Sequence, residues 1–227
     1  MRNRAMTPER EVVHHPHHTG RRSLDLTLAL CAMFVSVVSL IVAVRHGVIM
    51  DHLVAANSWP FLTFSTDNLA PDGTHRISLS IENAGVGPAR IETFEVWWDG
   101  QPVASADELV ARCCMPQSHA RLTLDEVKGL QLIIGTVAPA VLRAGGAQNI
   151  LSVARTDANA DVWGRLDAAR LNLKMRACYC SVFDECWITN LVDTDTKEVS
   201  TCPAAKVPFV VPERFYKAPS QPAAASN

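Results

Sequence analysis

An uncharged apolar run of 19 residues, 26–44, constrains this chain more than any other feature of its sequence. At about 1.5 Å per residue, a helix of that length covers about 28 Å, close to the roughly 30 Å hydrocarbon core of a bilayer. A core helix of a soluble protein normally carries a polar stripe, whereas only hydroxyl side chains interrupt this run. The sequence therefore predicts a transmembrane helix that contacts the lipid bilayer through residues 24–44.

A cleaved signal peptide is the main alternative to a permanent anchor. Signal peptides have an apolar core of about 7–15 residues with a small-residue cleavage site close behind it. Here the apolar run is longer, Arg45 follows it directly, and the nearest small-residue site lies near Ala55. We therefore expect an uncleaved helix that outruns the membrane and ends near Asn57, because Pro60 disfavours helical geometry at Trp59.

The charge distribution predicts the orientation of this anchor. Five arginines lie in residues 1–22, whereas Arg45 is the only one within fifteen residues after the run. By the positive-inside rule, the N-terminus should be cytoplasmic and the rest of the chain should lie outside. The net charge of −2 gives no reason to expect a nucleic-acid partner. We expect a basic tail at 1–22, a helix with an extramembrane extension at 23–57, an extracytoplasmic domain at 58–214 and a disordered tail at 215–227.

Short alternating runs dominate the predicted external domain. Ile77, Leu79 and Ile81 alternate with polar neighbours in residues 76–82, as in a half-buried strand. Similar patterns predict further strands at residues 91–98, 101–103, 131–135, 149–154, 171–179 and 187–191. Many short strands separated by turns indicate an antiparallel β-sandwich.

Helical patterns lie between some of these strands. Residues 105–108 form a capping-box motif that precedes Leu109, Val110 and Cys113 on one helical face. Residues 123–126 form a second such motif, and residues 160–170 show another helical face. We therefore expect one mainly β domain with helical insertions.

Six of the seven cysteines lie in this domain, and Cys31 lies within the apolar run. An even number of cysteines outside the cytoplasm predicts disulfides. The candidates for disulfide bonds are Cys113, Cys114, Cys178, Cys180, Cys186 and Cys202.

Local geometry narrows the fifteen possible pairings of six cysteines. Cys178 and Cys180 share a strand face and should not pair, and a vicinal Cys113–Cys114 bond needs a strained eight-membered ring. A Cys180–Cys186 bond would close a five-residue loop across a hairpin, and we expect it first. The other expected pairs, Cys114–Cys178 and Cys113–Cys202, would tie the first helix and the tail to that hairpin.

The cysteines and a few other residues of the body could in principle support other chemistries. The Cys-x-Cys-x5-Cys spacing could bind zinc or copper(I), but thiolate ligands need a reduced site. A thiol–disulfide enzyme usually carries Cys-x-x-Cys, which is absent from the sequence. For nucleophilic catalysis the body offers only Ser118, His119 and His75, without a G-x-S-x-G elbow. We therefore expect no catalytic residues, no metal site and no cofactor.

The adjacent residues Trp97 and Trp98 are the candidate contact surface. Neighbouring residues of a strand face opposite sides of the sheet. One indole should therefore enter the core, while the other is either exposed or covered by an insertion. An exposed indole is a candidate for binding a partner.

Three segments carry a resemblance to a known group of proteins. They are Asn-Ser-Trp-Pro-Phe at 57–61, Asn-Ala-Gly-Val-Gly-Pro-Ala at 83–89 and Cys-Tyr-Cys-Ser-Val-Phe-Asp-Glu-Cys-Trp at 178–187. Together they resemble a set of uncharacterised bacterial single-pass membrane proteins, which implies a location in the bacterial inner membrane. The second segment, ahead of a strand that ends at Asp99-Gly100, is also similar to immunoglobulin-like adhesion modules, which implies an immunoglobulin-like sandwich.

The function expected from these features is binding. A membrane-anchored periplasmic module would act as a scaffold or envelope sensor, with a protein partner in the cell envelope. The alternative is an extracytoplasmic enzyme or a metal or redox protein that uses the cysteine cluster.

Overall fold

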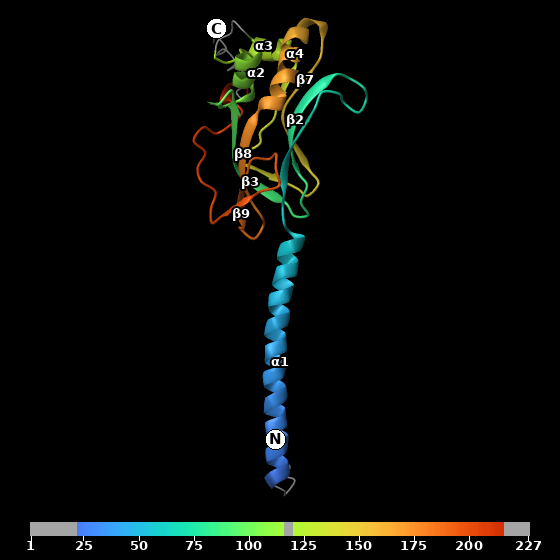
Figure 1. Cartoon of the computed structure of the whole chain (residues 1–227), viewed down its shortest axis with the longest axis vertical. Helices are drawn as coiled ribbons and strands as arrows, with labels where there is room; N and C mark the ends of the chain where they lie inside the picture. Colours follow the sequence, from blue (N-terminus) through green and yellow to red (C-terminus); the bar gives the residue numbers. More distant parts are fainter. Residues whose placement is uncertain (1–21, 116–119, 216–227) are drawn as a thin grey trace, which may run out of the picture. The chain divides into compact units, whose positions relative to one another are not determined.

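The computed structural model describes residues 22–115 and 120–215, and the chain divides into two units, Met1–Leu53 and Val54–Asn227. Figure 1 shows the arrangement of the elements within each unit. The predicted basic tail lies outside the described residues except for Arg22. The predicted disordered tail lies outside them except for Phe215.

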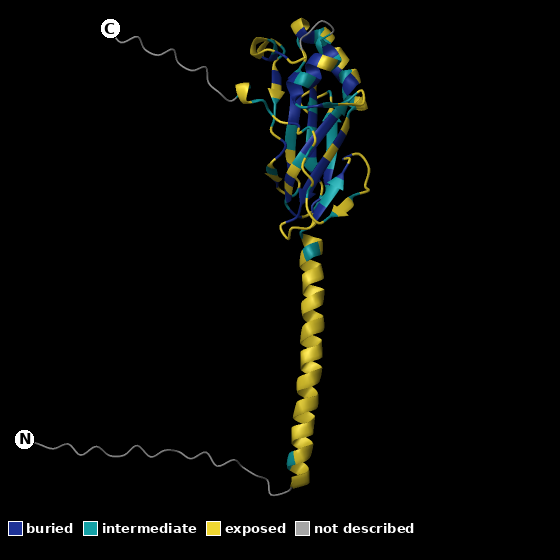
Figure 2. Ribbon diagram, turned by 90° about the vertical axis from the view of Figure 1, so that its left-hand side faces the viewer, coloured by how far each residue is buried: buried dark blue, intermediate teal, exposed yellow. Residues whose placement is uncertain are grey.

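A single long helix, α1 (Arg22–Asn57), precedes the strands. None of its residues is buried, and Figure 2 shows it exposed along most of its length. Within the described part of the chain, it is the one helix long and apolar enough to cross a membrane, judged by length and composition. It ends where the sequence predicted, and the Ser58 hydroxyl donates to the carbonyls of Val54 and Ala55 at 2.9 and 3.0 Å.

The second unit contains two antiparallel sheets, of four and six strands. The four-stranded sheet has the order β1-β2-β7-β5, and the six-stranded sheet has the order β10-β9-β8-β3-β4, with β6 also paired to β3. The strands are β1 (Leu62–Asp67), β2 (Arg76–Asn83), β3 (Ala89–Trp98), β4 (Gln101–Val103), β5 (Leu132–Ile134), β6 (Ala140–Leu142), β7 (Ala147–Ala154), β8 (Lys174–Cys180), β9 (Cys186–Thr189) and β10 (Lys197–Val199). The prediction of a mainly β domain with helical insertions is confirmed.

The helical segments are α2 (Ala106–Cys114), α3 (Leu124–Gly129), α4 (Ala160–Ala169) and the short turns η1 (Asp157–Asn159), η2 (Arg170–Asn172) and η3 (Glu213–Phe215). The capping box predicted at Thr123 and Glu126 forms at α3. The one predicted at Ser105 does not form, because the Ser105 side chain makes no cap hydrogen bond. The Glu108 carboxylate instead accepts from Arg112 and Arg121 at 3.3 and 3.4 Å.

The core is one cluster of buried side chains drawn from both sheets and from the helices. On β2, the buried residues are the predicted Ile77, Leu79 and Ile81. On β3, the alternation is interrupted by a register shift between Ile91 and Thr93. Phe94, Val96 and Trp98 therefore pack on the core side, while Thr93, Glu95 and Trp97 lie on the opposite face.

A buried asparagine holds the start of this unit in place. Asn83 is 1% exposed, and its side-chain oxygen accepts from the amides of Phe61 and Gly85, both at 3.1 Å. Its amide nitrogen donates to the carbonyls of Gly87 and Leu142 at 2.8 and 3.1 Å. The first two segments that carry the resemblance are therefore in direct contact.

Gly87 lies where the backbone leaving α1 passes closest to this turn. A Cβ atom added at Gly87 would lie 1.9 Å from the Ser58 carbonyl oxygen, a distance that requires the backbone to shift. A Cβ atom added at Gly129, at the end of α3, would have no heavy atom within 4 Å beyond those of its own helix and chain neighbours. The two glycines thus form a matched pair for testing the close approach.

We expect Gly87→Ala to lower the free energy of unfolding of the full chain by about 1–3 kcal/mol, as overpacking of a well-packed site does. Gly129→Ala should change it by less than about 0.5 kcal/mol, because it adds a methyl group to solvent. Urea unfolding in detergent micelles, followed by tryptophan fluorescence, measures both values. Equal and small effects would contradict the close approach of Ser58.

Candidate functional site

The candidate site is the face of the six-stranded sheet that lies opposite the core, called here the outer face. Side chains alternate between the two faces of a strand, so residues paired across β3 and β8 share a face. The pairs on the outer face are Thr93 with Cys178, Glu95 with Arg176, and Trp97 with Lys174. The neighbouring strand β9 adds Cys186 opposite Cys180 and Ile188 opposite Cys178. Cysteines therefore lie toward one end of this face and Trp97 toward the other.

The structure joins the cysteines of the body in three disulfides. Cys180 bonds to Cys186 across the β8–β9 hairpin, which is the pair expected first. The other two bonds are Cys178–Cys202 and Cys113–Cys114. The expected pairs Cys114–Cys178 and Cys113–Cys202 are wrong.

The correction has a structural cause. Cys114, 1% exposed, packs in the core, whereas Cys178 lies on the outer face and does not belong to the core cluster. The chain after β10 returns over β8 and brings the Cα atom of Cys202 to 5.6 Å from that of Cys178. Cys113 and Cys114 then bond to each other, although the sequence argument rejected this vicinal pair.

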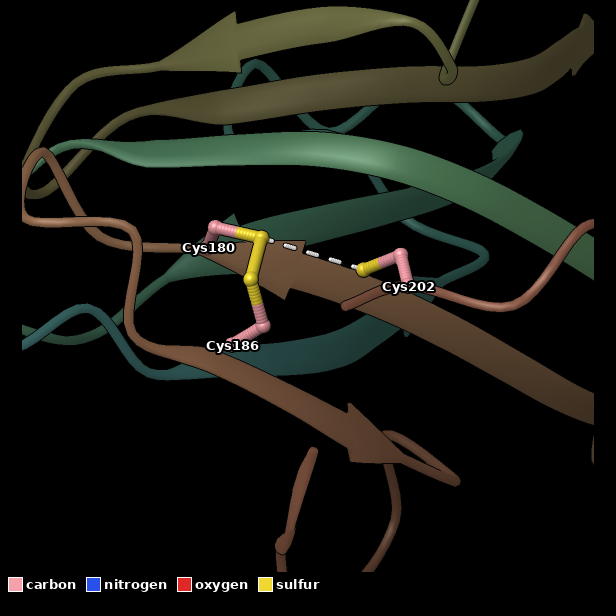
Figure 3. Close-up of side chains that lie close together, drawn as sticks. All are labelled: Cys180, Cys186 and Cys202. Atoms are coloured by element: carbon pink, nitrogen blue, oxygen red, sulfur yellow. Dashed lines mark hydrogen bonds between the residues drawn. A yellow bond between two sulfur atoms is a disulfide. The ribbon is translucent and has the colours of Figure 1, made fainter. Parts of the chain in front are cut away.

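Two of the disulfides are neighbours. The Sγ atoms of Cys180 and Cys202 lie 3.8 Å apart, and the Sγ atoms of Cys180, Cys186 and Cys202 all lie within 4.8 Å of one another (Figure 3). Neither sulfur of the 3.8 Å pair carries a proton in the disulfide state, so this is a van der Waals contact. The three sulfurs could hold zinc or copper(I) only after both disulfides had been reduced.

The segment that carries Cys202 crosses the outer face, and residues 200–212 are called here the C-terminal strap. It follows β10 and is the red segment beside β8 and β3 in Figure 1. The amides of Phe209 and Val210 donate to the carbonyls of Phe94 and Ala104, both at 2.9 Å. The Phe209 ring is 2% exposed and meets Phe94 edge-on, with ring centres 5.6 Å apart. The strap is thus fixed at both ends, by a disulfide and by an aromatic side chain.

Glu95 fixes the middle of the strap. This residue is 3% exposed, and its Oε1 atom accepts from the amides of Lys206 and Val207 at 2.9 and 3.3 Å. Its Oε2 atom accepts from Arg176 Nε at 2.9 Å and also from Arg176 Nη2. Burial alone would raise the pKa of Glu95, but these four donors outweigh it and hold the pKa below its usual value.

A second buried carboxylate anchors the chain beyond the strap. Asp107 of α2 is fully buried and pairs with Arg214, which also donates to the Leu122 carbonyl at 3.3 Å. The Arg214 guanidinium lies 4.9 Å from the centre of the Phe215 ring. In the sequence, Asp107 stands within a capping motif, and its ion pair with Arg214 leaves no local signal because the two residues are so far apart in the chain.

The region around Trp97 forms a groove of about 830 Å³ on the outer face. The Arg176 guanidinium lies 5.4 Å from the centre of the Trp97 ring. The other residues that line the groove are Gly100, Leu173, Lys174, Met175, Ile188, Thr189, Asn190, Val192, Asp193 and Asp195. Trp98 packs against the core, so the two indoles point to opposite sides of the sheet. That Trp97 or Trp98 contacts a partner stays a prediction.

Of the three residues considered for nucleophilic catalysis, His75 alone lies in the part of the chain that the structure describes. His75 packs edge-on against Trp163, with ring centres 6.2 Å apart. Ser118 and His119 lie outside the part of the chain that the structure describes.

Comparison with known proteins adds no relative from which a function could be transferred. No family model matches the chain, and no match was found among curated proteins or solved structures. The resemblance to bacterial membrane proteins stays a prediction, and so does the immunoglobulin-like character of the sheets. The function is therefore argued from the geometry of the outer face.

The position of Glu95 predicts a specific pH dependence of stability. A carboxyl group with a lowered folded-state pKa contributes stability above its unfolded-state pKa of about 4.3 and loses it as the pH falls through the folded-state value. Glu95→Gln should therefore lower the free energy of unfolding by about 1–3 kcal/mol at pH 7. The gap to the unaltered chain should narrow as the pH falls below about 4.3.

Urea unfolding at pH 7 and at pH 3 measures this gap. The matched control is Glu92→Gln, an exposed glutamate of the same strand, which should have a small effect at pH 7. A gap for Glu95→Gln that is constant from pH 7 to pH 3 would contradict the assignment of a buried, charged Glu95.

Proposed function

We propose that this chain is a membrane-anchored binding or scaffolding module of the bacterial cell envelope. In this proposal α1 spans the inner membrane, with the N-terminus in the cytoplasm and the body in the periplasm as an immunoglobulin-like sandwich. The module acts by binding a protein partner, in the manner of a scaffold or an envelope sensor, and has no catalytic activity of its own.

Two features support the proposed topology. Five arginines precede the apolar run, whereas only Arg45 lies within fifteen residues after it, which favours a cytoplasmic N-terminus. The six cysteines of the body lie in pairs that can form disulfides, which suits an oxidising compartment.

The groove around Trp97 is the observation that carries the binding proposal. An indole beside aliphatic side chains offers a large apolar contact area, and tryptophan is enriched among residues that dominate binding energy. The groove also carries both signs of charge, with Lys174 on β8 and Asp193 and Asp195 on the loop between β9 and β10. We therefore propose that the partner is a protein segment. It would place an apolar side chain in the groove, between Lys174 and the two aspartates.

Site-specific photocrosslinking in intact membranes tests this proposal. A photoreactive residue at Val192, which lines the groove and is 75% exposed, should yield a defined crosslinked partner. Trp97→Ala in the same chain should reduce the yield about tenfold or more, as truncation of an anchor residue does. The matched control position is Val141 on β6, which is 72% exposed and does not line the groove.

The two positions separate specific binding from general crowding. A product that forms at Val192, disappears with Trp97→Ala and is absent at Val141 would support the groove. The same product at both positions, or a yield indifferent to Trp97, would contradict it.

A further inference from the structure

We propose that Cys178, Cys180, Cys186 and Cys202 form a thiol–disulfide exchange site at which reduction passes from one disulfide to the next. A dithiol first reduces the hairpin bond Cys180–Cys186. The freed Cys180 thiolate then attacks Cys202 of the Cys178–Cys202 bond and displaces Cys178. The exchange is stoichiometric, with one dithiol oxidised per chain, so it adds no catalytic activity to the proposed module, and it does not depend on binding in the Trp97 groove.

The contact between the two disulfides is the first observation behind this proposal. The 3.8 Å between the Sγ atoms of Cys180 and Cys202 is a non-bonded contact, short enough that the sulfurs can react after a small movement. A reactive group held in contact with its target acts at a very high effective concentration. Cys180 is therefore the sulfur placed to link the two bonds.

Access from solvent is the second observation. A surface hollow of about 370 Å³ is lined by Cys180, Cys186 and Cys202, together with residues of β3 and of the strap. The three cysteines thus border one opening on the outer face. Cys178 does not line this hollow, although Cys178 and Cys180 are both 2% exposed and Cys186 is 4% exposed. An external dithiol in the hollow therefore meets both cysteines of the hairpin disulfide but only Cys202 of the Cys178–Cys202 bond.

The exchange balances in three steps, each of which forms one sulfur–sulfur bond and breaks another. A thiolate of the external dithiol attacks Cys186, forms a mixed disulfide there and releases Cys180 as a thiolate. The Cys180 thiolate attacks Cys202, which forms the Cys180–Cys202 bond and releases Cys178, which takes up a proton. The second thiol of the dithiol then attacks the mixed disulfide, so that the dithiol leaves oxidised and Cys186 leaves as a thiol.

The net change is the loss of one disulfide from the protein and the oxidation of one dithiol. The strap stays tied to β8, because Cys202 moves from Cys178 to Cys180 on the same strand. The product carries free thiols at Cys178 and Cys186, which is a pattern that independent reduction of either disulfide does not produce.

Limited reduction of the full chain in detergent tests this pattern. One molar equivalent of dithiothreitol is added, free thiols are blocked by alkylation, and the peptides are mapped by mass spectrometry. Chymotryptic cleavage after Tyr179 and Phe183 separates Cys178, Cys180 and Cys186 into different peptides. We expect alkylated Cys178 and Cys186 together with a peptide pair joined by Cys180–Cys202.

Two results would overturn the proposal. One is alkylation of Cys180 and Cys186 with Cys178–Cys202 intact. The other is alkylation of Cys178 and Cys202 with Cys180–Cys186 intact. Either pattern would show that the two disulfides are reduced independently. Because both patterns are measured on the unaltered chain, the test does not require a variant to fold.

The rate of the transfer provides a second measurement. In Cys180→Ser/Cys186→Ser, which lacks the hairpin disulfide, labelling of Cys178 by limiting dithiothreitol should slow at least about tenfold, because the neighbouring thiolate is lost. Cys113→Ser/Cys114→Ser, which removes the remote vicinal pair, should keep the original rate. Equal rates in the unaltered chain and in the first variant would overturn the proposal.

Discussion

The outer face of this protein depends on one buried carboxylate. A charged carboxylate that loses its contact with water must recover the lost solvation from hydrogen-bond donors. Glu95 recovers it from Arg176 on the neighbouring strand and from the amides of Lys206 and Val207 on the strap. Because the donors belong to two separate segments, the requirement to satisfy one charge fixes the strap against the sheet.

The contacts of Glu95 affect both ends of the outer face. Toward one end, the strap brings Cys202 to Cys178 and into contact with Cys180. Toward the other, the Arg176 side chain that binds Glu95 also lies over the Trp97 ring that lines the groove. The proposed exchange site and the proposed binding groove thus share a connected set of contacts, with Glu95 and Arg176 between them.

Sequence patterns were sufficient for the elements whose signal is local. The alternation around Ile77 predicted β2, and the Thr123–Glu126 motif predicted the cap of α3. The loop between Cys180 and Cys186 is short enough that their pairing follows from hairpin geometry.

The features that the sequence argument missed depend on contacts between distant residues. The register shift after Ile91 changes which residues of β3 face the core, and no local pattern marks it. The path of the strap over β8 decides the partner of Cys178, and it is fixed by bonds to Glu95 that span more than a hundred residues. The Ser105 hydroxyl makes no cap hydrogen bond, and the Glu108 side chain accepts from Arg112 and Arg121, contacts that the motif at 105–108 does not predict.

Hydrogen–deuterium exchange of the strap tests the central claim most directly. The amides of Lys206, Val207, Phe209 and Val210 are bonded to the sheet or to the chain beside it, so they should exchange at least about a hundredfold more slowly than freely exposed amides. The measurement is made on the oxidised full chain, with peptides covering residues 203–212. Protection at these four positions is the predicted result, and exchange at the rate of an unstructured peptide would contradict a strap held by Glu95.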